Sequence, residues 1–305
     1  MAEAEWIDLV DPDEAELQRR FGQTLHPLAI TRLLEPAKHE DEPRPTIERH
    51  EGYVFGVILV AVAVPEEDRL FYQEIDIVVT HGMLLTVRKT PPGEKPYDTS
   101  DVHATCDADG EPAKPGMVLY HLIDDIAERY LDLIDSINDE IDELEDHVED
   151  WSNARVRERI SGLRHDLLHV RRTLAPTRDA VRRVVDGRIG LEGAKLFTPD
   201  VQLHFADAYD KLLRASDGLE LSRDLVAGVR DYSQAKIAND QNEVTKRLTA
   251  VASILLVPTF IVGLYGQNFR HIPELLWGFG YWWSWAWIIA ATVFQIVFYR
   301  RKGWL

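Results

Sequence analysis

Small and polar side chains recur along one face of a helical segment near the C-terminus. Their spacing is seven residues with intermediate steps of three or four, and the set is Asn242, Thr245, Thr249, Ala252, Leu256, Thr259 and Gly263, of which Leu256 alone is neither small nor polar. This spacing places all of them on one side of a helix. Amide and hydroxyl oxygens on such a face can accept hydrogen bonds from the water around a cation, so the chemistry to expect is ion passage.

Two interpretations of this stripe compete. Small residues also let membrane helices pack closely, which needs no water and no ion. Continuing the stripe backward by four, three and four residues adds Ala238, Ala235 and Asp231. A carboxylate and an amide on the same face favour a cation path. Because one helix cannot enclose a path, this interpretation requires a ring of subunits.

Two apolar segments near the C-terminus can hold this face in a membrane. Leu248 to Tyr265 and Tyr281 to Tyr299 contain no charged residue. At a rise of 1.5 Å per residue they cover about 27–29 Å, close to the hydrocarbon thickness of a bilayer. The segment 266–280 between them is short and only turns the chain around. We therefore predict a first transmembrane helix over 248–265, an external loop over 266–280 and a second transmembrane helix over 281–299.

Basic residues flank the hairpin at its two outer ends. Lys246 and Arg247 precede the first segment, and Arg300, Arg301 and Lys302 follow the second. This asymmetry predicts a multi-pass protein of the inner or plasma membrane, with both termini and the tail 300–305 in the cytoplasm. The acidic N-terminus lacks the features of a secretory signal peptide.

The N-terminal part, 1–115, reads as a small α/β domain. Helices are expected after Asp11-Pro12-Asp13 and over Pro27–Leu34, and strands are expected over Gly52–Val64, Phe71–Val79 and Met83–Arg88. The proline-rich stretch Thr90–Pro115 is interpreted as a loop or linker.

Long helical patterns occupy the middle of the chain. Apolar residues at spacings of three and four predict an antiparallel helical pair over 116–187, broken near Trp151-Ser152-Asn153, with Asn153 as the candidate cap of the second helix. A stalk helix is expected over 198–247 and runs on into the first transmembrane segment. The predicted class is thus an α+β cytoplasmic domain with a long helical stalk and two transmembrane helices.

Composition excludes several functions. The formal net charge is −18, from 52 acidic and 34 basic residues, which disfavours nucleic-acid binding and favours cations as partners. The single cysteine, Cys106, excludes a disulfide framework or a cysteine-rich zinc site. No catalytic triad, phosphate-binding loop or dinucleotide motif is recognisable, so we do not expect an enzyme.

The C-terminal third carries a recognisable series of motifs. In order, they are Asn242-Glu243-Val244, Pro258-Thr259-Phe260-Ile261, Gly263-Leu264-Tyr265-Gly266-Gln267-Asn268-Phe269, Pro273-Glu274-Leu275 and Lys302-Gly303-Trp304-Leu305. They resemble the CorA family of magnesium channels and transporters. Trp6-Ile7-Asp8-Leu9 and Leu25-His26-Pro27-Leu28 resemble the N-terminal domain of the same family, so the resemblance spans the chain.

The resemblance implies a CorA-like homopentamer in which the first transmembrane helix lines the pore and the second forms an outer ring. At the outer mouth the usual Gly-Met-Asn signature is replaced by Gly266-Gln267-Asn268, which bears on ion selectivity. Asn242 and Thr259 resemble polar rings of the pore, and Leu248 and Leu256 align with apolar constrictions. Asp231 aligns with an acidic ring at the cytoplasmic entrance.

The resemblance also implies regulation by the transported ion. Asp207 aligns with a regulatory position on the stalk, and its partner carboxylate is expected from the linker of the next subunit, with Asp98 and Asp101 as candidates. Cytoplasmic Mg²⁺ bound between subunits would offset the repulsion between acidic chains and hold the ring closed.

The function expected from these features is magnesium uptake by a channel whose partners are its own copies, membrane lipids and divalent cations. A transporter of the same architecture for Zn²⁺, Co²⁺ or Ni²⁺ is the first alternative. A membrane-anchored helical scaffold or signalling protein is the second, but an anchor has no use for Asp231 or for an amide-bearing loop.

Overall fold

A computed structural model defines residues 5–37, 43–64, 69–108, 114–190, 196–268 and 272–305. The chain divides into two compact units, Met1–Arg230 and Asp231–Leu305. Helix α6 (Pro199–Tyr265) contributes residues to both units.

The first unit is built on a five-stranded sheet with the order β1-β5-β4-β3-β2. Its strands are β1 (Glu5–Val10), β2 (Thr46–Arg49), β3 (Val54–Val64), β4 (Arg69–Val79) and β5 (Met83–Lys89). Strand β1 is parallel to β5, and the other neighbours are antiparallel. The run Val-Phe-Gly-Val-Ile-Leu-Val-Ala-Val-Ala-Val of β3 suits a strand covered on both faces, because β-branched side chains pack well on a pleated surface.

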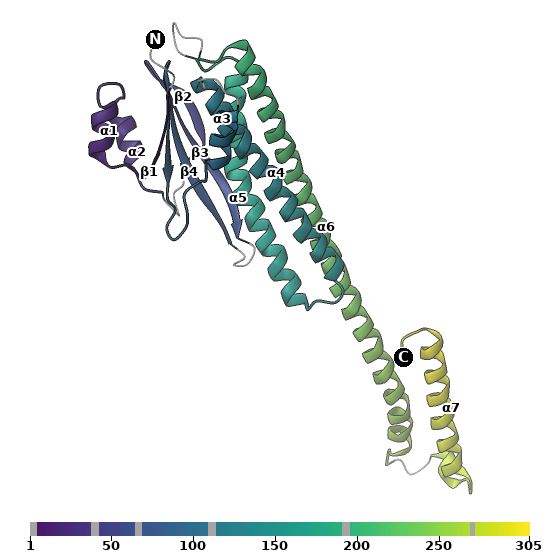
Figure 1. Cartoon of the computed structure of the whole chain (residues 1–305). Coiled ribbons are helices and arrows are strands. Elements are labelled where there is room, and N and C mark those ends of the chain that lie inside the picture. Colours follow the sequence, from purple (N-terminus) through teal and green to yellow (C-terminus); the bar gives the residue numbers. More distant parts are fainter. Residues whose placement is uncertain (1–4, 38–42, 65–68, 109–113, 191–195, 269–271) are drawn as a thin grey trace. The chain divides into compact units, whose positions relative to one another are not determined.

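Helices cover both faces of this sheet (Figure 1). On one face, α1 (Glu14–Phe21) and α2 (Pro27–Leu34) form a core with strands β3, β4 and β5. It contains Leu17, Phe21, Ile30 and Leu33 of the helices and Phe55, Val57, Val78, Leu85 and Val87 of the strands. Asp13 caps α1 by accepting a hydrogen bond from the Glu16 N–H, as the Asp-Pro-Asp sequence indicates. On the other face lie α3 (Ser100–Ala108), α4 (Pro115–His147) and α5 (Asn153–Val185).

The larger core joins the sheet to α4, α5 and the first part of α6. Leu119, Ile126, Leu167 and Phe205 are all almost fully buried in it. Tyr130 spans the layers, because its ring is buried and its hydroxyl donates to the Leu59 carbonyl of β3 at 2.7 Å.

Asp8 ties the edge strand β1 to its surroundings. Its carboxylate accepts hydrogen bonds from Thr86 and Arg88 of β5 and from Thr99 just before α3. A second Arg88 nitrogen lies 2.8 Å from the same carboxylate. The Trp6-Ile7-Asp8-Leu9 sequence therefore serves to anchor an edge strand.

A buried charge cluster lies beneath α2. Lys89 Nζ lies 2.6 Å from a Glu74 oxygen and 2.9 Å from Asp76 Oδ2, and it donates to the Arg32 carbonyl at the end of α2. Glu74, Asp76 and Lys89 are all buried. Burial raises the pKa of Asp76 to about 7, since the opposing charge of Lys89 is shared with Glu74. The Lys89 ammonium thus pairs with two carboxylates and also binds the C-terminal end of α2.

The structure departs from the sequence-based expectation at three places. The stretch expected to be a linker contains helix α3 over Ser100–Ala108. Strands β1 and β2 were not among the expected strands, because each is short and lies at a sheet edge. At the break between α4 and α5 the capping side chain is that of Ser152, which accepts from the Arg155 N–H, and Asn153 is the first helical residue.

The second unit contains the C-terminal part of α6, a 3₁₀ turn η2 (Pro273–Leu276) and α7 (Gly280–Arg301). Among the described residues, α6 and α7 are the two helices long and apolar enough to cross a membrane, with mean hydropathy of 2.1 and 1.3 in their most apolar windows. Almost none of the residues in these windows is buried within one chain. Such surfaces require lipid or other subunits to cover them.

Candidate functional site

The predicted stripe lies on the second unit's portion of α6 and is open to the surroundings along its whole length. All of its members are exposed, namely Asp231, Ala235, Ala238, Asn242, Thr245, Thr249, Ala252, Leu256, Thr259 and Gly263. Leu248 and Leu256, the two predicted constrictions, are 69% and 68% exposed. A single subunit therefore covers neither the polar nor the apolar positions of this face.

Helix α7 contacts α6 next to the stripe. The Gln295 amide of α7 donates to the Ser253 carbonyl at 3.0 Å, and Ala250, on the same side of α6 as Ser253, is buried. At about 100° per residue, Leu256 lies roughly 120° around the helix from Ala250. The stripe is therefore left available for contact with water or with another copy of the chain.

The three threonines of the stripe use their hydroxyl protons locally. Thr245, Thr249 and Thr259 each donate to the backbone carbonyl four residues earlier, at 2.7–2.8 Å. With its proton directed at the helix, each hydroxyl oxygen keeps its two lone pairs as hydrogen-bond acceptors. This geometry suits hydrogen bonds from the water shell of a cation.

The predicted outer-mouth motif follows the end of α6. The Gly266 N–H donates to the Val262 carbonyl at 2.9 Å, and a Cβ added at Gly266 would lie 3.1 Å from that same oxygen. A side chain at this position would therefore be tight against the last turn of α6. Gln267 and Asn268 are exposed. Phe269, the last residue of the motif, lies outside the described residues.

Asp207, the predicted regulatory residue, lies in the first unit and takes part in an ionic cluster. Its side chain is 61% exposed, and one carboxylate oxygen lies 3.9 Å from Lys211 Nζ. The same ammonium lies 2.7 Å from both Asp124 and Glu128 of α4. Burial alone would lower the pKa of Lys211, but its hydrogen bonds to Asp124 and Glu128 outweigh this and raise it. Lys211 therefore stays protonated beside three carboxylates.

Asp98 and Asp101 belong to a different local arrangement. The Asp98 carboxylate accepts from the N–H and hydroxyl of Ser100, which lowers its pKa, and its backbone carbonyl accepts from Arg129. Asp101 is in the first turn of α3. Within one chain, the described residues contain no group of three or more His, Cys, Asp or Glu side chains that could hold a metal ion.

The sequence analysis missed the Lys211 cluster. Its signal was present in two spacings of four residues, Asp124 to Glu128 on one helix and Asp207 to Lys211 on another. Only the packing of α4 against α6 shows that the two pairs share one ammonium.

Comparison with known proteins identifies similar sequences over nearly the whole chain. A family model described as CorA-like Mg²⁺ transporter protein matches residues 2–301. The protein YfjQ of Bacillus subtilis is 30% identical over 307 residues, which cover 98% of this chain and 89% of YfjQ. The cobalt/magnesium transport protein CorA of Thermotoga maritima is 28% identical over 98% of this chain and 83% of its own length.

Solved structures resemble the fold. The complete structure of the CorA magnesium transporter from Methanocaldococcus jannaschii has a TM-score of 0.77 and 24% identity, covering 98% of this chain and 91% of that one. The full-length CmaX protein has a TM-score of 0.65 and 21% identity, covering 98% and 88%. At these identities the matches establish the architecture.

Proposed function

Because the chain belongs to the family of CorA-like Mg²⁺ transporter proteins, we propose that it is a homopentameric membrane channel that conducts magnesium into the cytoplasm. The observation that carries this proposal is the stripe from Asp231 to Gly263, all of whose members are exposed in a single chain. In a ring of five chains these stripes would face one another around a water-filled path.

The stripe suits an ion that keeps its water. Magnesium binds six oxygens near 2.1 Å and gives up its waters reluctantly. Neutral acceptors such as the Asn242 amide and the Thr249 and Thr259 hydroxyls can bind those waters without holding the ion tightly. Conduction then needs no covalent chemistry. Asn268, with Gln267 and Gly266, would form the first such ring at the outer mouth.

Apolar and acidic rings would complete the path. Leu248 and Leu256 are uncharged and exposed in the single chain, so rings of them would form constrictions that close by excluding water. Five copies of Asp231 would concentrate divalent cations at the cytoplasmic end.

The orientation in the membrane follows from charge. Lys246 and Arg247 before the first span, and Arg300 and Arg301 in the last turn of α7, would lie on the cytoplasmic side. In this orientation the first unit and both termini would be in the cytoplasm, and the Gly266-Gln267-Asn268 loop would be outside.

Closure by cytoplasmic Mg²⁺ is the regulation that we propose. Asp207 is exposed, and a divalent ion between Asp207 and a carboxylate of the next subunit, Asp98 or Asp101, would link neighbouring chains. Each chain carries a net charge of −18, so loss of the ions would let the subunits separate.

A transporter for Co²⁺, Ni²⁺ or Zn²⁺ is the second candidate. Two features favour testing it: Gln267 replaces the methionine of the usual signature, and the similar protein of Thermotoga maritima is named a cobalt/magnesium transport protein. The architecture proposed here is the same for either ion class.

Flux measurements on purified protein in liposomes test the proposal. Uptake of Mg²⁺, Co²⁺ and Zn²⁺ is measured in parallel for the wild type, for Asn268→Ala and for Asn239→Ala. Asn239 is an exposed asparagine of α6 outside the stripe and serves as the matched control. We expect Mg²⁺ flux in the wild type and in the control, and a loss of about tenfold or more in Asn268→Ala. Equal flux in all three proteins would contradict the role of Asn268. Absence of flux of all three ions in the wild type would contradict the assignment of the chain as a divalent cation channel.

A further inference from the structure

Two histidines lie side by side on α5 in the first unit, and the proposed ion path uses neither of them. His165 and His169 are four residues apart, which places them on one face of the helix, and their ring centroids are 4.2 Å apart. The His165 side chain is exposed, and among the residues that the structure describes no hydrogen bond involves its ring. Two imidazoles at this spacing can bind the same transition-metal ion.

The His169 ring is held by strand β4. Its Nδ1 lies 2.9 Å from the hydroxyl oxygen of Tyr72. In the tautomer whose Nδ1–H donates to this oxygen, Nε2 keeps its lone pair for a metal. Metal-binding histidines usually donate their second ring nitrogen to an oxygen in this way, because the hydrogen bond fixes the ring and makes the ligand more basic. Tyr72 is therefore placed to orient His169 as a ligand.

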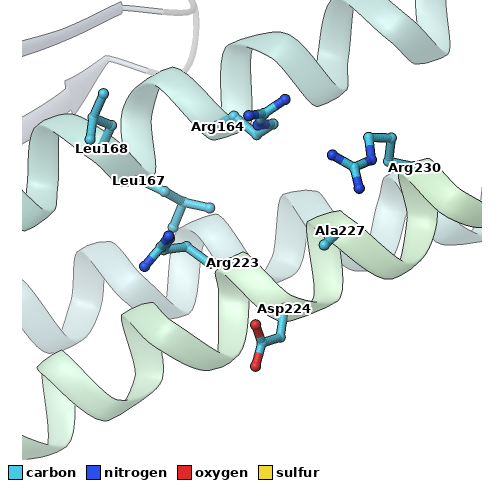
Figure 2. A pocket seen from close by; sticks show the side chains of 7 residues that line it. All are labelled: Arg164, Leu167, Leu168, Arg223, Asp224, Ala227 and Arg230. Carbon is cyan, nitrogen blue, oxygen red and sulfur yellow. The ribbon is translucent and has the colours of Figure 1, made fainter.

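The surroundings keep the His169 ring neutral, as metal binding requires. Burial has the largest effect in lowering the pKa of His169, and His165 and Arg172 lower it further. Arg164, next to His165 in the sequence, is directed to another side of α5, where it lines a pocket against α6 together with Leu167 (Figure 2). Arg172 disfavours a cation that is held by charge alone. Imidazole nitrogens bind Ni²⁺ and Zn²⁺ by coordination, whereas Mg²⁺ prefers oxygen ligands.

We propose that His165 and His169 bind one transition-metal ion of the Ni²⁺, Co²⁺ or Zn²⁺ class, with water completing its coordination. Metal–nitrogen bonds of about 2.1 Å at tetrahedral or octahedral angles require two nitrogens about 3.0–3.4 Å apart. Ring centroids 4.2 Å apart bring this separation within reach of a rotation of the exposed His165 ring. Two protein ligands make an open site from which the ion can exchange, in contrast to a closed structural site with four. The proposal does not depend on which ion the channel conducts.

Calorimetric titration of the full-length protein with Ni²⁺ tests the site. The protein is purified without a histidine tag, and Mg²⁺ is present in large excess so that sites made of oxygen ligands are occupied. We expect one Ni²⁺ per chain and a dissociation constant raised about tenfold or more in His165→Gln and in His169→Gln. The matched control is His81→Gln, which changes an exposed histidine between β4 and β5 and should leave the constant unchanged. Absence of Ni²⁺ binding, or equal weakening in all three variants, would overturn the proposal.

Two further measurements test how the pair is built. Tyr72→Phe should weaken Ni²⁺ binding about tenfold, because His169 loses the hydrogen bond that fixes its ring, and unchanged binding would overturn the orienting role of Tyr72. Ni²⁺ should raise the melting temperature of the wild type and of His81→Gln but not that of His165→Gln. One ion per two chains would assign the histidines to a contact between copies and overturn the pair within one chain. None of these measurements requires ion flux, so a failure of the channel proposal would leave them unchanged.

Discussion

Each threonine hydroxyl of the α6 stripe can act as a donor to the helix and as an acceptor for groups outside it. Each donates its proton to a carbonyl four residues earlier and keeps an oxygen lone pair for the outside. In water this local bond contributes little to helix stability. On a pore wall it would orient the acceptor, because the proton no longer competes with the waters of the ion.

Replacing Thr259 by valine tests this arrangement. Valine has nearly the same shape but lacks the acceptor, so we expect Mg²⁺ flux in liposomes to fall about tenfold, whereas Thr259→Ser retains most of it. Ser253→Ala is the control, because Ser253 lies on the side of α6 that contacts α7. Wild-type flux in Thr259→Val would show that this hydroxyl has no part in conduction.

Lys211 is the residue whose role the structure changes most. Its ammonium pairs with Asp124 and Glu128 and lies near Asp207, so its positive charge weakens the attraction of Asp207 for a divalent ion. We predict that Lys211→Gln lowers the internal Mg²⁺ concentration that inhibits flux by up to about fivefold. Asp207→Ala should raise the same concentration.

The internal Mg²⁺ concentration that halves the flux measures both shifts. Arg214→Gln, which changes another basic residue of α6, is the control for a general change in net charge. If both variants shifted this concentration in the same direction, Lys211 would not weaken the binding of Mg²⁺ at Asp207.

At the scale of elements, the start of α4 packs closely against the segment before α6, and a glycine lies at the contact. A Cβ added at Gly116 would lie 2.6 Å from the Leu196 carbonyl and 3.4 Å from Val201. Gly228 in α6 has open space at the corresponding point. The two glycines therefore have opposite consequences when replaced by alanine.

We predict that Gly116→Ala destabilises the folded chain by about 1–3 kcal/mol, because α4 must move away from the segment before α6. Gly228→Ala should stabilise it by about 0.5–1 kcal/mol, because alanine loses less backbone entropy in a helix. Thermal melting in detergent followed by circular dichroism measures both. Equal melting temperatures for the two variants would contradict the close packing at Gly116.

The junction of α2 with the sheet should depend on pH. Because the folded-state pKa of Asp76 is raised from 3.8 to about 7, the folded state holds a proton that the unfolded chain releases. The stabilisation that this proton provides is complete below about pH 4 and is lost as the pH rises through about 7, with a slope of at most about 1.4 kcal/mol per pH unit.

Asp76→Asn removes this titration. We expect the melting temperature of the variant to rise relative to that of the wild type as the pH increases from about 5 to about 8. A difference between the two proteins that stays constant with pH would show that Asp76 does not hold the proton.

At the scale of the whole molecule, the exposed apolar windows of α6 and α7 indicate that one chain is not the functional unit. We predict that native mass spectrometry of the protein in lipid or detergent gives five times the chain mass of 34.9 kDa. Cross-linking between cysteines introduced at Thr249 should join neighbouring chains, because facing stripes would bring these positions together. A population limited to monomers or dimers would leave no enclosed path.

Much of the architecture was predictable from periodic patterns. The helix over Pro27–Leu34 was predicted with its observed bounds, and the long helices and central strands lie within a few residues of their expected positions. Helix α3 was missed because its helical pattern is weak and prolines flank it on both sides. Strands β1 and β2 were missed because short edge strands depend on partners distant in sequence for their hydrogen bonds.

The sequence by itself determined the family, the two apolar spans and the stripe, because these depend on residue type and on spacing along one helix. Only the tertiary structure decided which charges share a partner. The ion pairs of Lys211 with the acids of α4, and of Lys89 with Glu74 and Asp76, join different helices or different strands. The physical reason is that ion pairing and desolvation depend on distances through space, which packing sets and local periodicity does not record.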